Sequence, residues 1–241
     1  MIDIDKFHTF FYLIANKNGR GTVTPSQFNS IVERALFAWT NKQISNQKEY
    51  QPGNPMPRTS LDLDQASIDR LKHLKETHTV SCLGGEMPIP NGVTKDINGV
   101  IMPEYWTLSR LTHKYQSNGK IVTQPISIVK DNEWAINLSS SIVAPTKKRA
   151  IANIQSDNFL IEPSSLINLV TLVYLRVPNT PVWGYNLTNN RPVYDSSKSQ
   201  SIDAPKQAFN EIAMIALELI GIVIREPELV QAASGLENTG V

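Results

Sequence analysis

Cysteine is nearly absent from the sequence, because Cys82 is the only one among 241 residues. A single cysteine excludes an intrachain disulfide framework and a zinc site of the CxxC type. The chain also lacks an excess of charge, with 23 Lys and Arg against 22 Asp and Glu. Such a near-neutral chain is not coated by nucleic acid over its whole surface, although its composition remains compatible with a local basic surface.

Long hydrophobic runs are missing as well. The most apolar stretch, residues 212–224, is interrupted by Glu218 and is shorter than the ~20 residues of a membrane span. The N-terminus, Met-Ile-Asp-Ile-Asp-Lys, carries acids where a signal peptide needs positive charge. We therefore expect a soluble protein with no secretory signal and no membrane partner. With 41% hydrophobic residues the chain can bury a core, as one large domain or two small ones.

Common catalytic and cofactor motifs are absent too: there is no G-x-S-x-G, P-loop, H-E-x-x-H or G-x-G-x-x-G sequence. We predict no catalytic residue, no cofactor and no metal. His73 and His78 are five residues apart, which does not match the i, i+4 spacing of a helical ligand pair. His8 and His113 are isolated in the sequence.

Cys82 precedes Gly84-Gly85, which resembles a nucleophile beside a turn that binds an oxyanion. A catalytic cysteine needs a positioned histidine base, which a sequence cannot show. We favour the alternative, a small buried residue before a tight turn.

The last forty residues, 201–241, contain the most clearly patterned helix. Asp203 is a good N-cap, and Pro205 suits the first turn. Apolar residues then recur at helical spacing to about residue 223, with Asn210, Glu211 and Glu218 on the opposite side. Further apolar residues make a second side of the helix apolar, and we expect another layer of protein, such as a second subunit, to cover it. The candidate interface residues in this helix are Ile212, Ile215, Leu219 and Ile222.

The N-terminal region predicts two amphipathic helices, over residues 3–16 and 24–43. The Gly-rich segment 18–21 would join them as a helical hairpin. We expect residues 1–45 to pack with residues 201–241 as one helical bundle. A shorter helix is predicted over residues 227–233.

The middle of the chain has a mixed pattern. Residues 46–120 are rich in turn residues and predict an irregular insertion, with a short helix over 63–76 and an ambiguous segment at 104–111. Residues 121–185 predict an antiparallel β region, and residues 186–200 a polar linker. This order of helices, strands and a final helix indicates an α+β fold. The strands expected in the β region are 134–136, 149–155, 159–163 and, with the strongest pattern, 169–177.

Two short segments have a functional and a structural interpretation each. Trp183 and Tyr185 follow two prolines and would either anchor in a neighbour's pocket or cover the edge of their own sheet. Lys147, Lys148 and Arg149 form the one basic cluster, which would contact DNA phosphates or an acidic partner. We favour a solvated approach to a strand for this cluster, because three charges make a weak footprint.

Three stretches together resemble a known family. The first includes Phe-Tyr-Leu-Ile-Ala-Asn-Lys-x-x-Arg-Gly at residues 11–21 and Thr-Pro-Ser-Gln-Phe-Asn at 24–29. The second is residues 170–185, and the third is Asn-Glu-Ile at 210–212 with residues 224–230. In combination they resemble a virion structural protein of crAss-like and related phages of Bacteroidetes bacteria, a ring component of the head-to-tail connector. The resemblance covers both ends and residues 131–185, but not residues 42–124.

This resemblance implies a homo-oligomeric, twelve-fold ring beneath the portal of a short-tailed phage. Portal and tail proteins would be its partners, and genomic DNA would pass through its lumen without sequence-specific contacts. The protein would be found in the virion. A tail-tube or tail-hub subunit is the first alternative, and a hydrolase that uses Cys82 or a histidine is the second.

Overall fold

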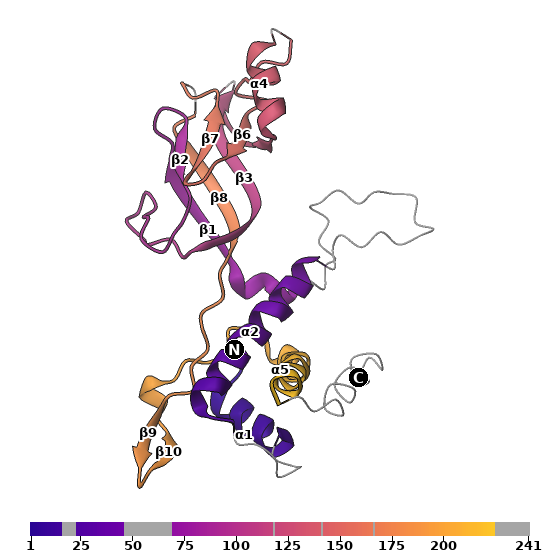
Figure 1. Cartoon of the computed structure of the whole chain (residues 1–241). Helices are drawn as coiled ribbons and strands as arrows, with labels where there is room; N and C mark the ends of the chain where they lie inside the picture. Colours follow the sequence, from indigo (N-terminus) through magenta and orange to yellow (C-terminus); the bar gives the residue numbers. More distant parts are fainter. Residues whose placement is uncertain (16–22, 46–68, 118, 141, 166, 225–241) are drawn as a thin grey trace. The chain divides into compact units, whose positions relative to one another are not determined.

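The computed structural model describes residues 1–15, 23–45, 69–117, 119–140, 142–165 and 167–224. The chain divides into two compact units (Figure 1). We call Met1–His73 with Pro178–Val241 the helical unit, and Leu74–Val177 the β unit. Helices and antiparallel sheets are both present, so the predicted α+β class is confirmed.

The two N-terminal helices form where the sequence predicted them. Helix α1 spans Ile4–Ala15 and helix α2 spans Pro25–Ser45. Thr24 and Gln27 form a reciprocal capping box at the start of α2: the Thr24 N–H donates to Oε1 of Gln27 at 2.9 Å, and the Gln27 N–H donates to Oγ1 of Thr24 at 3.3 Å. The rings of Phe11 and Phe28 pack edge to face at 5.3 Å, so the apolar sides of α1 and α2 meet. The predicted connection at 18–21 lies outside the described residues.

The C-terminal helix begins later than predicted. Helix α5 spans Phe209–Ile224 and follows the 3-10 turn η4, Lys206–Ala208. Asp203 therefore does not sit at its N-cap; instead Oδ2 of Asp203 accepts a hydrogen bond from the Asn179 N–H at 3.2 Å. Proline at position 205 lets η4 start, and its extended backbone separates Asp203 from the helix. The predicted helix 227–233 lies outside the described residues.

The chain itself covers most of α5. None of its described apolar side chains is exposed; Ile212, Ala216 and Ile220 are fully buried. Helix α5 packs against α2 and also contacts α1, where the Phe209 ring lies 5.2 Å from that of Phe7. We expected another layer of protein, such as a second subunit, to supply this cover, and over the described part of the helix its own chain supplies most of it. Periodicity shows that a helix has two apolar sides but not which segments of the same chain reach them.

A β-hairpin occupies the segment predicted as a linker. Strands β9 (Tyr185–Thr188) and β10 (Arg191–Tyr194) pair only with each other (Figure 1). Asn189 and Asn190 both have positive φ, as the two central residues of a type I′ hairpin turn require. From composition alone, the polar pair Asn189-Asn190 is assigned to a linker. Its positive φ angles show that it forms the turn of a hairpin. The 3-10 turn η3, Ser196–Lys198, follows the hairpin.

The β unit consists of two four-stranded sheets. The first has the order β1-β8-β3-β4, all antiparallel, and the second β2-β7-β6-β5, in which only β5 and β6 are parallel. The strands are β1 (Lys75–Ser81), β2 (Glu86–Pro88), β3 (Tyr105–Ser117), β4 (Lys120–Pro125), β5 (Ser127–Ile128), β6 (Ile151–Ile154), β7 (Asn158–Glu162) and β8 (Leu169–Arg176).

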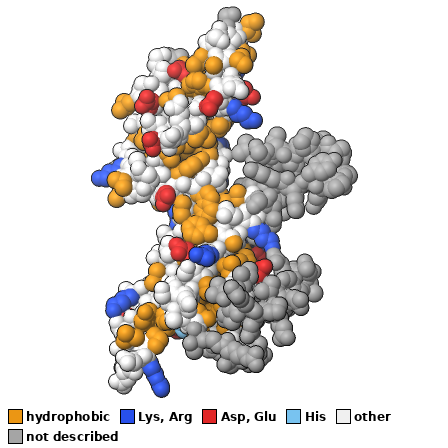
Figure 2. All heavy atoms as spheres, in the orientation of Figure 1, with side chains coloured by type: hydrophobic (Ala, Val, Ile, Leu, Met, Phe, Trp, Pro, Cys, Tyr) orange, Lys and Arg blue, Asp and Glu red, His pale blue; other side chains and the backbone are white. Residues whose placement is uncertain are grey.

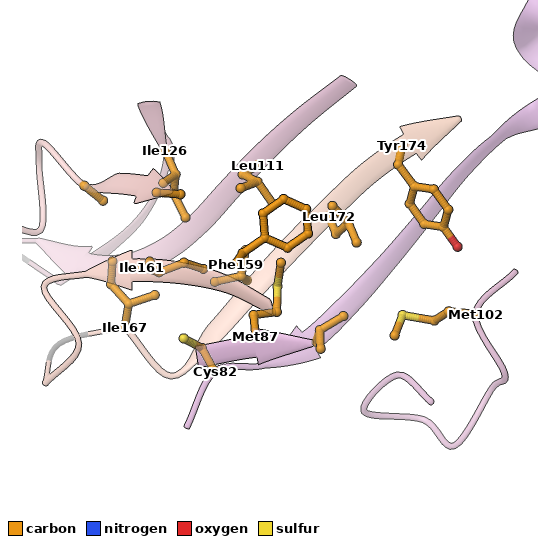
Figure 3. Packing of buried hydrophobic residues seen from close by; sticks show 14 residues of the cluster. Cys82, Met87, Met102, Leu111, Ile126, Phe159, Ile161, Ile167, Leu172 and Tyr174 are labelled. Carbon is orange, nitrogen blue, oxygen red and sulfur yellow. The ribbon is translucent and has the colours of Figure 1, made fainter. Parts of the chain in front are cut away.

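The inner sides of the two sheets share one core. Phe159 and Ile161 of β7 face Leu172 and Tyr174 of β8 and Leu111 of β3 (Figure 3). All five side chains are at most 1% exposed, which is typical of a sandwich core filled from both sheets. This core fixes the positions of the surface elements that follow.

Several predictions for the middle of the chain are confirmed. Strand β8 matches the predicted strand 169–177, and β7 pairs antiparallel with β6 as expected for 149–155 and 159–163. The segment 104–111, which was ambiguous, belongs to β3. Strand β6 does not alternate, however, because Ile151, Ala152 and Asn153 are all buried.

The prediction of an irregular segment there is wrong. Residues 75–117 lie in the region expected to be irregular, yet they contain β1, β2 and β3. Strand β1 has a weak pattern because Glu76 and His78 occupy core-side positions normally held by apolar residues. The predicted helix 63–76 is confirmed in part: residues 69–71 are helical, the 3-10 turn η2 (Lys72–Leu74) follows before β1 begins, and residues 63–68 lie outside the described part.

Residues 134–136, predicted as a strand, belong to helix α4 (Asp131–Ser139). Asp131 and Glu133 in its first turn favour a helix N-terminus, and this effect outweighs the strand propensity of a three-residue apolar segment.

Candidate functional site

The predicted interface residues of α5 are mostly inside the helical unit. Ile212 is fully buried, and Ile215 and Leu219 are half-buried. The side chain of Ile222 lies outside the described residues. Ile212 is therefore a core residue, and this structure does not leave it free to contact another molecule.

Trp183 is held by α1 and α2. Its indole stacks on the His8 ring, with centroids 3.9 Å apart and planes inclined by 4°, and its Nε1–H donates to Oδ1 of Asp5 at 3.1 Å. Its backbone N–H donates to Oδ1 of Asn29 at 2.8 Å. With only 4% of its surface exposed, Trp183 packs within its own unit. Burial lowers the pKa of the His8 imidazole, although the nearby Asp5 carboxylate raises it.

Trp183 anchors the β9–β10 hairpin, which projects away from it. The Tyr185 ring stacks on Trp183 at 5.8 Å, and the Tyr185 backbone pairs with Tyr194. Beyond Tyr185 every residue of the two strands is exposed, including Leu187 (69%) and Val193. An isolated two-stranded hairpin is only marginally stable. Its fixed base and the exposed apolar residues of its strands make it a candidate contact element, which Figure 2 shows with orange side chains at the lower left.

Helix α4 is the second projecting element. None of its residues is buried, and Ile136 (64%), Leu138 and the following Ile142 (91%) are exposed (Figure 2). One polar contact fixes its start: Nδ2 of Asn153 donates to Oδ1 of Asp131 at 2.8 Å. Ile136 and Leu138 are two residues apart and lie on different sides of the helix, so α4 exposes apolar side chains around its circumference and is a candidate contact element.

The basic cluster lies on a tight turn between α4 and β6. Lys147, Lys148 and Arg149 are all exposed. The Arg149 guanidinium donates to the Val143 carbonyl at 2.8 Å, and Nε2 of Gln124 donates to the Lys148 carbonyl at 3.1 Å. The turn thus packs against β4, and its two lysine side chains extend into solvent. This arrangement is compatible with a phosphate contact and with the solvated approach to a strand that we favoured.

Cys82 lies in the core of the β unit (Figure 3) and is 2% exposed. Burial raises the pKa of its thiol, and the carboxylates of Glu162 and Glu86 raise it further, although a hydrogen bond from the Gly85 backbone opposes the change. The neutral thiol is therefore favoured, and a thiol is a poor nucleophile. The buried small residue that we preferred describes this position.

The histidines do not converge on one site. Nε2 of His73 lies 2.9 Å from the Asp203 carbonyl oxygen in the helical unit, whereas His78 and His113 belong to the β unit. His113 is 2% exposed. Burial lowers the pKa of its imidazole, and a hydrogen bond with the Lys147 backbone opposes this. Among the described residues, no three His, Cys, Asp or Glu side chains are grouped so that they could hold a metal ion. None of the helices in this part of the chain is long and apolar enough to cross a membrane.

A polar cluster that the sequence did not reveal closes one end of the β core. Nδ1 of His78 lies 3.2 Å from Oδ2 of Asp96, and Nε2 of His78 lies 3.8 Å from Oε2 of Glu76. Glu76 also lies 3.5 Å from Nε of Arg176. The only sequence signal was the i, i+2 spacing of Glu76 and His78, which places both on one face of a strand.

Asp96 holds a loop onto this cluster. Its Oδ1 accepts hydrogen bonds from the N–H groups of Asn98 and Val100, at 2.8 and 2.9 Å. Although desolvation raises the pKa of Asp96, the hydrogen bonds from Val100, His78 and Asn98 outweigh it and lower the pKa. The cluster therefore has a structural role: it ties the 91–101 loop to β1.

Comparison of the chain with protein-family models and with curated proteins gives no match.

Proposed function

We propose that the chain is a structural, non-enzymatic subunit of a phage head-to-tail connector. In this proposal it forms a homo-oligomeric, twelve-fold ring below the portal, joins portal and tail proteins in the virion, and lets DNA pass through its lumen. The proposal rests on the resemblance of the three sequence stretches together with the exposed apolar elements.

The observation that carries the proposal is that each unit bears a projecting element with exposed apolar side chains. The helical unit has the β9–β10 hairpin with Leu187 and Val193, and the β unit has α4 with Ile136 and Ile142. A head-to-tail interface joins two different surfaces of identical subunits, and it closes into a ring when the rotation closes. Two unlike apolar elements on one chain supply the two halves of such an interface.

We therefore propose the β9–β10 hairpin and α4 as the interface between subunits, in place of the α5 residues proposed from the sequence. Helices α1, α2 and α5 form, in the proposal, a bundle that gives the subunit a rigid frame. The edge-to-face packing of Phe7 on Phe209 and of Phe11 on Phe28 supports this frame. So does the hydrogen bond from Nε1 of Trp39 to Oε2 of Glu211 at 2.7 Å. A rigid frame lowers the entropy lost on assembly.

Electron microscopy of the purified full chain tests the proposal. We expect closed rings of one diameter, which a variant with Ile136→Ser, Leu138→Ser and Ile142→Ser no longer forms. A matched control carries Ile97→Ser, Val100→Ser and Ile101→Ser, which are also exposed aliphatic residues, on the 91–101 loop of the β unit. Rings should persist in this control.

Monodisperse monomers of the unmodified chain, with no binding to portal or tail proteins, would contradict the proposal. If rings survive the α4 substitutions, the connector proposal stands, but α4 does not belong to the interface between subunits. Location of the protein in a virion map separates a connector from a tail-tube or tail-hub subunit.

A further inference from the structure

We infer that the outer edge of β9 pairs with the outer edge of β4 in a second copy of this chain, so that the two strands become neighbours in one antiparallel sheet. The outer edge of a strand is the side that faces away from its partner strand in the same sheet. Unpaired backbone N–H and C=O groups on such an edge are recognised by another extended strand. The inference deepens the proposed function and rests on it for the head-to-tail arrangement of the copies.

The hydrogen bonds of the β9–β10 hairpin show which backbone groups of β9 point outward. The Asp195 N–H donates to the Gly184 carbonyl at 2.9 Å, so the ladder is hydrogen-bonded at this position. Because bonded and non-bonded pairs alternate, the register points the N–H and C=O groups of Tyr185 and Leu187 away from β10. Among the described residues, no backbone group outside the hairpin bonds to either of them. The Leu187 side chain is 69% exposed.

Pro192 supports this assignment and interrupts the other edge of the hairpin. It lies opposite Leu187, where its missing N–H would also point outward, so the proline removes no hydrogen bond from the hairpin. The same missing donor interrupts the outer edge of β10, and proline is one of the means by which edge strands avoid pairing. Of the two edges of the hairpin, β9 is therefore the one that can accept a further strand.

Strand β4 has an edge of the same kind in the β unit. The Ile126 N–H, just after β4, donates to the Leu111 carbonyl at 2.9 Å. By the same alternation, Ile121 and Thr123 point their N–H and C=O groups away from β3, and Pro125 ends the row of donors. The Ile121 side chain is 75% exposed. No described backbone group bonds to this edge.

The other sheet edges in the described residues are covered, short or polar. On β2, the Glu86 N–H donates to the Leu83 carbonyl at 3.1 Å, and Pro88 has no N–H. On β1, which has no aliphatic residue at an outward position, the Thr79 carbonyl accepts from the Ile97 N–H at 3.0 Å. Strand β5 has only two residues. In this part of the chain, β9 and β4 are the edges that combine two outward-facing N–H groups with an exposed aliphatic side chain.

The two edges fit each other in one antiparallel register. When Leu187 lies opposite Ile121 of the second copy, Tyr185 lies opposite Thr123, and each pair can exchange both of its hydrogen bonds, about four in all. The Leu187 and Ile121 side chains then share one face of the joined sheet, where cross-strand aliphatic neighbours stabilise the pairing. The contact joins two unlike surfaces, one from each unit, as a head-to-tail interface requires.

Proline substitutions in the full chain test the contact. Leu187→Pro and Ile121→Pro each remove one outward-facing N–H, at positions equivalent to those of Pro192 and Pro125. The matched controls Leu187→Thr and Ile121→Thr lose the aliphatic side chain but keep the N–H and favour a strand. In sedimentation velocity, each proline variant should associate at least ten-fold more weakly than the unmodified chain. Each threonine variant should associate less than about five-fold more weakly.

A mixture of the two proline variants separates this contact from self-pairing of either edge. Each variant alone lacks one half of the contact and should be monomeric at concentrations where the unmodified chain assembles. In an equimolar mixture, the intact β9 of one variant and the intact β4 of the other should form a dimer and no larger species. If Ile121→Pro alone assembles like the unmodified chain, β9 pairs with itself, and if Leu187→Pro alone does so, β4 pairs with itself. Either result overturns the inference.

Hydrogen exchange in the unmodified chain gives a measurement that does not depend on how a variant folds. On assembly, the amides of Tyr185, Leu187, Ile121 and Thr123 should exchange at least ten-fold more slowly. The amide of Tyr194, on the other edge of the same hairpin, should exchange at the same rate in both states. Rings in which the four amides exchange as fast as in the diluted chain contradict only the inference. Slowed exchange in open chains of subunits, without closed rings, contradicts only the connector.

Discussion

Helices α5 and α4 differ in how far their apolar side chains are exposed, and the difference is the opposite of what their compositions suggest. Helix α5 is the most apolar segment of the chain, yet its described apolar side chains are buried or half-buried by the same chain. Helix α4 has a weak apolar pattern, yet it leaves Ile136 and Leu138 exposed and buries none of its residues. The comparison shows that an apolar helix marks an interface only when the rest of its own chain fails to cover it.

The largest expected difference between the two helices is in folding stability. Ile212→Ala in α5 should lower the free energy of unfolding by about 2–5 kcal/mol, because it leaves a cavity in a closed core. The matched substitution Ile136→Ala in α4 should change it by no more than about 0.5 kcal/mol. Urea denaturation of both variants measures the difference. Equal losses at the two positions would remove the basis of the comparison.

Two neighbouring glycines repeat the contrast between covered and open positions within one turn. A Cβ added at Gly85 would lie 2.7 Å from Cβ of Ser164 and 2.9 Å from the Ile161 carbonyl oxygen, whereas a Cβ at Gly84 would meet nothing within 4 Å. Both residues have positive φ, so each alanine costs about 1–2 kcal/mol in backbone strain. Gly85→Ala should add about 1–3 kcal/mol from overpacking, and thermal unfolding of the two single variants should resolve the difference. A Gly84→Ala variant as unstable as Gly85→Ala would show that backbone strain alone accounts for the loss of stability at both positions.

Acidic side chains on the two helices extend the comparison to polar contacts. Glu211 of α5 accepts from Nε1 of Trp39 at 2.7 Å and lies 3.1 Å from Nη1 of Arg70. Glu211→Gln should therefore cost about 1 kcal/mol, a small value because the ion pair is partly exposed to solvent. Glu133→Gln in the exposed first turn of α4 removes only a favourable charge near the helix N-terminus and should cost about 0.3 kcal/mol. Chemical denaturation at low and high salt checks both, and a loss in the Glu133 variant as large as that in the Glu211 variant would reveal a further contact of this side chain.

The smallest expected effect concerns buried histidine and pH. Burial places the pKa of His113 in the folded chain below its ordinary value of 6.5. Between those two pKa values the unfolded chain binds more protons, so stability is complete above about pH 6.5 and declines as the pH falls toward the folded-state pKa. Unfolding free energies from about pH 7.5 to pH 5 should show this decline, and a His113→Gln variant should show a smaller one. An unchanged slope in the variant would assign the decline to other groups, of which His8 is the first to examine because its pKa is lowered in the same way.

Local patterns predicted the elements whose apolar periodicity is complete. Helices α1 and α2 and strand β7 were predicted because their buried side chains follow the period of the element. Strand β8 was predicted because it is rich in β-branched and aromatic residues, although its buried residues do not alternate. Strand β1 was missed because Glu76 and His78 occupy its core side, and α4 was missed because no residue of it is buried. Periodicity fails where the side chains that face the core are polar or where no core contact exists.

The candidate surfaces depended even more on the tertiary structure. Trp183 was predicted either to anchor in a neighbour's pocket or to cover the edge of its own sheet; in the structure His8, Asp5 and Asn29 hold it against α1 and α2. No sequence pattern marked Leu187 and Ile121 as edge residues, because only the strand pairing shows that β9 and β4 are outermost in their sheets.

The sequence by itself determined the α+β class, the helices at both ends and the strands β6, β7 and β8, because these patterns of apolar residues are a local property. Only the tertiary structure decided which apolar side chains remain exposed and which strand edges remain unpaired. Cover and register depend on segments far apart in the chain: Ile212 is buried in a unit whose other helices, α1 and α2, begin about two hundred residues earlier, whereas Ile136, equally apolar, is left exposed by the described residues.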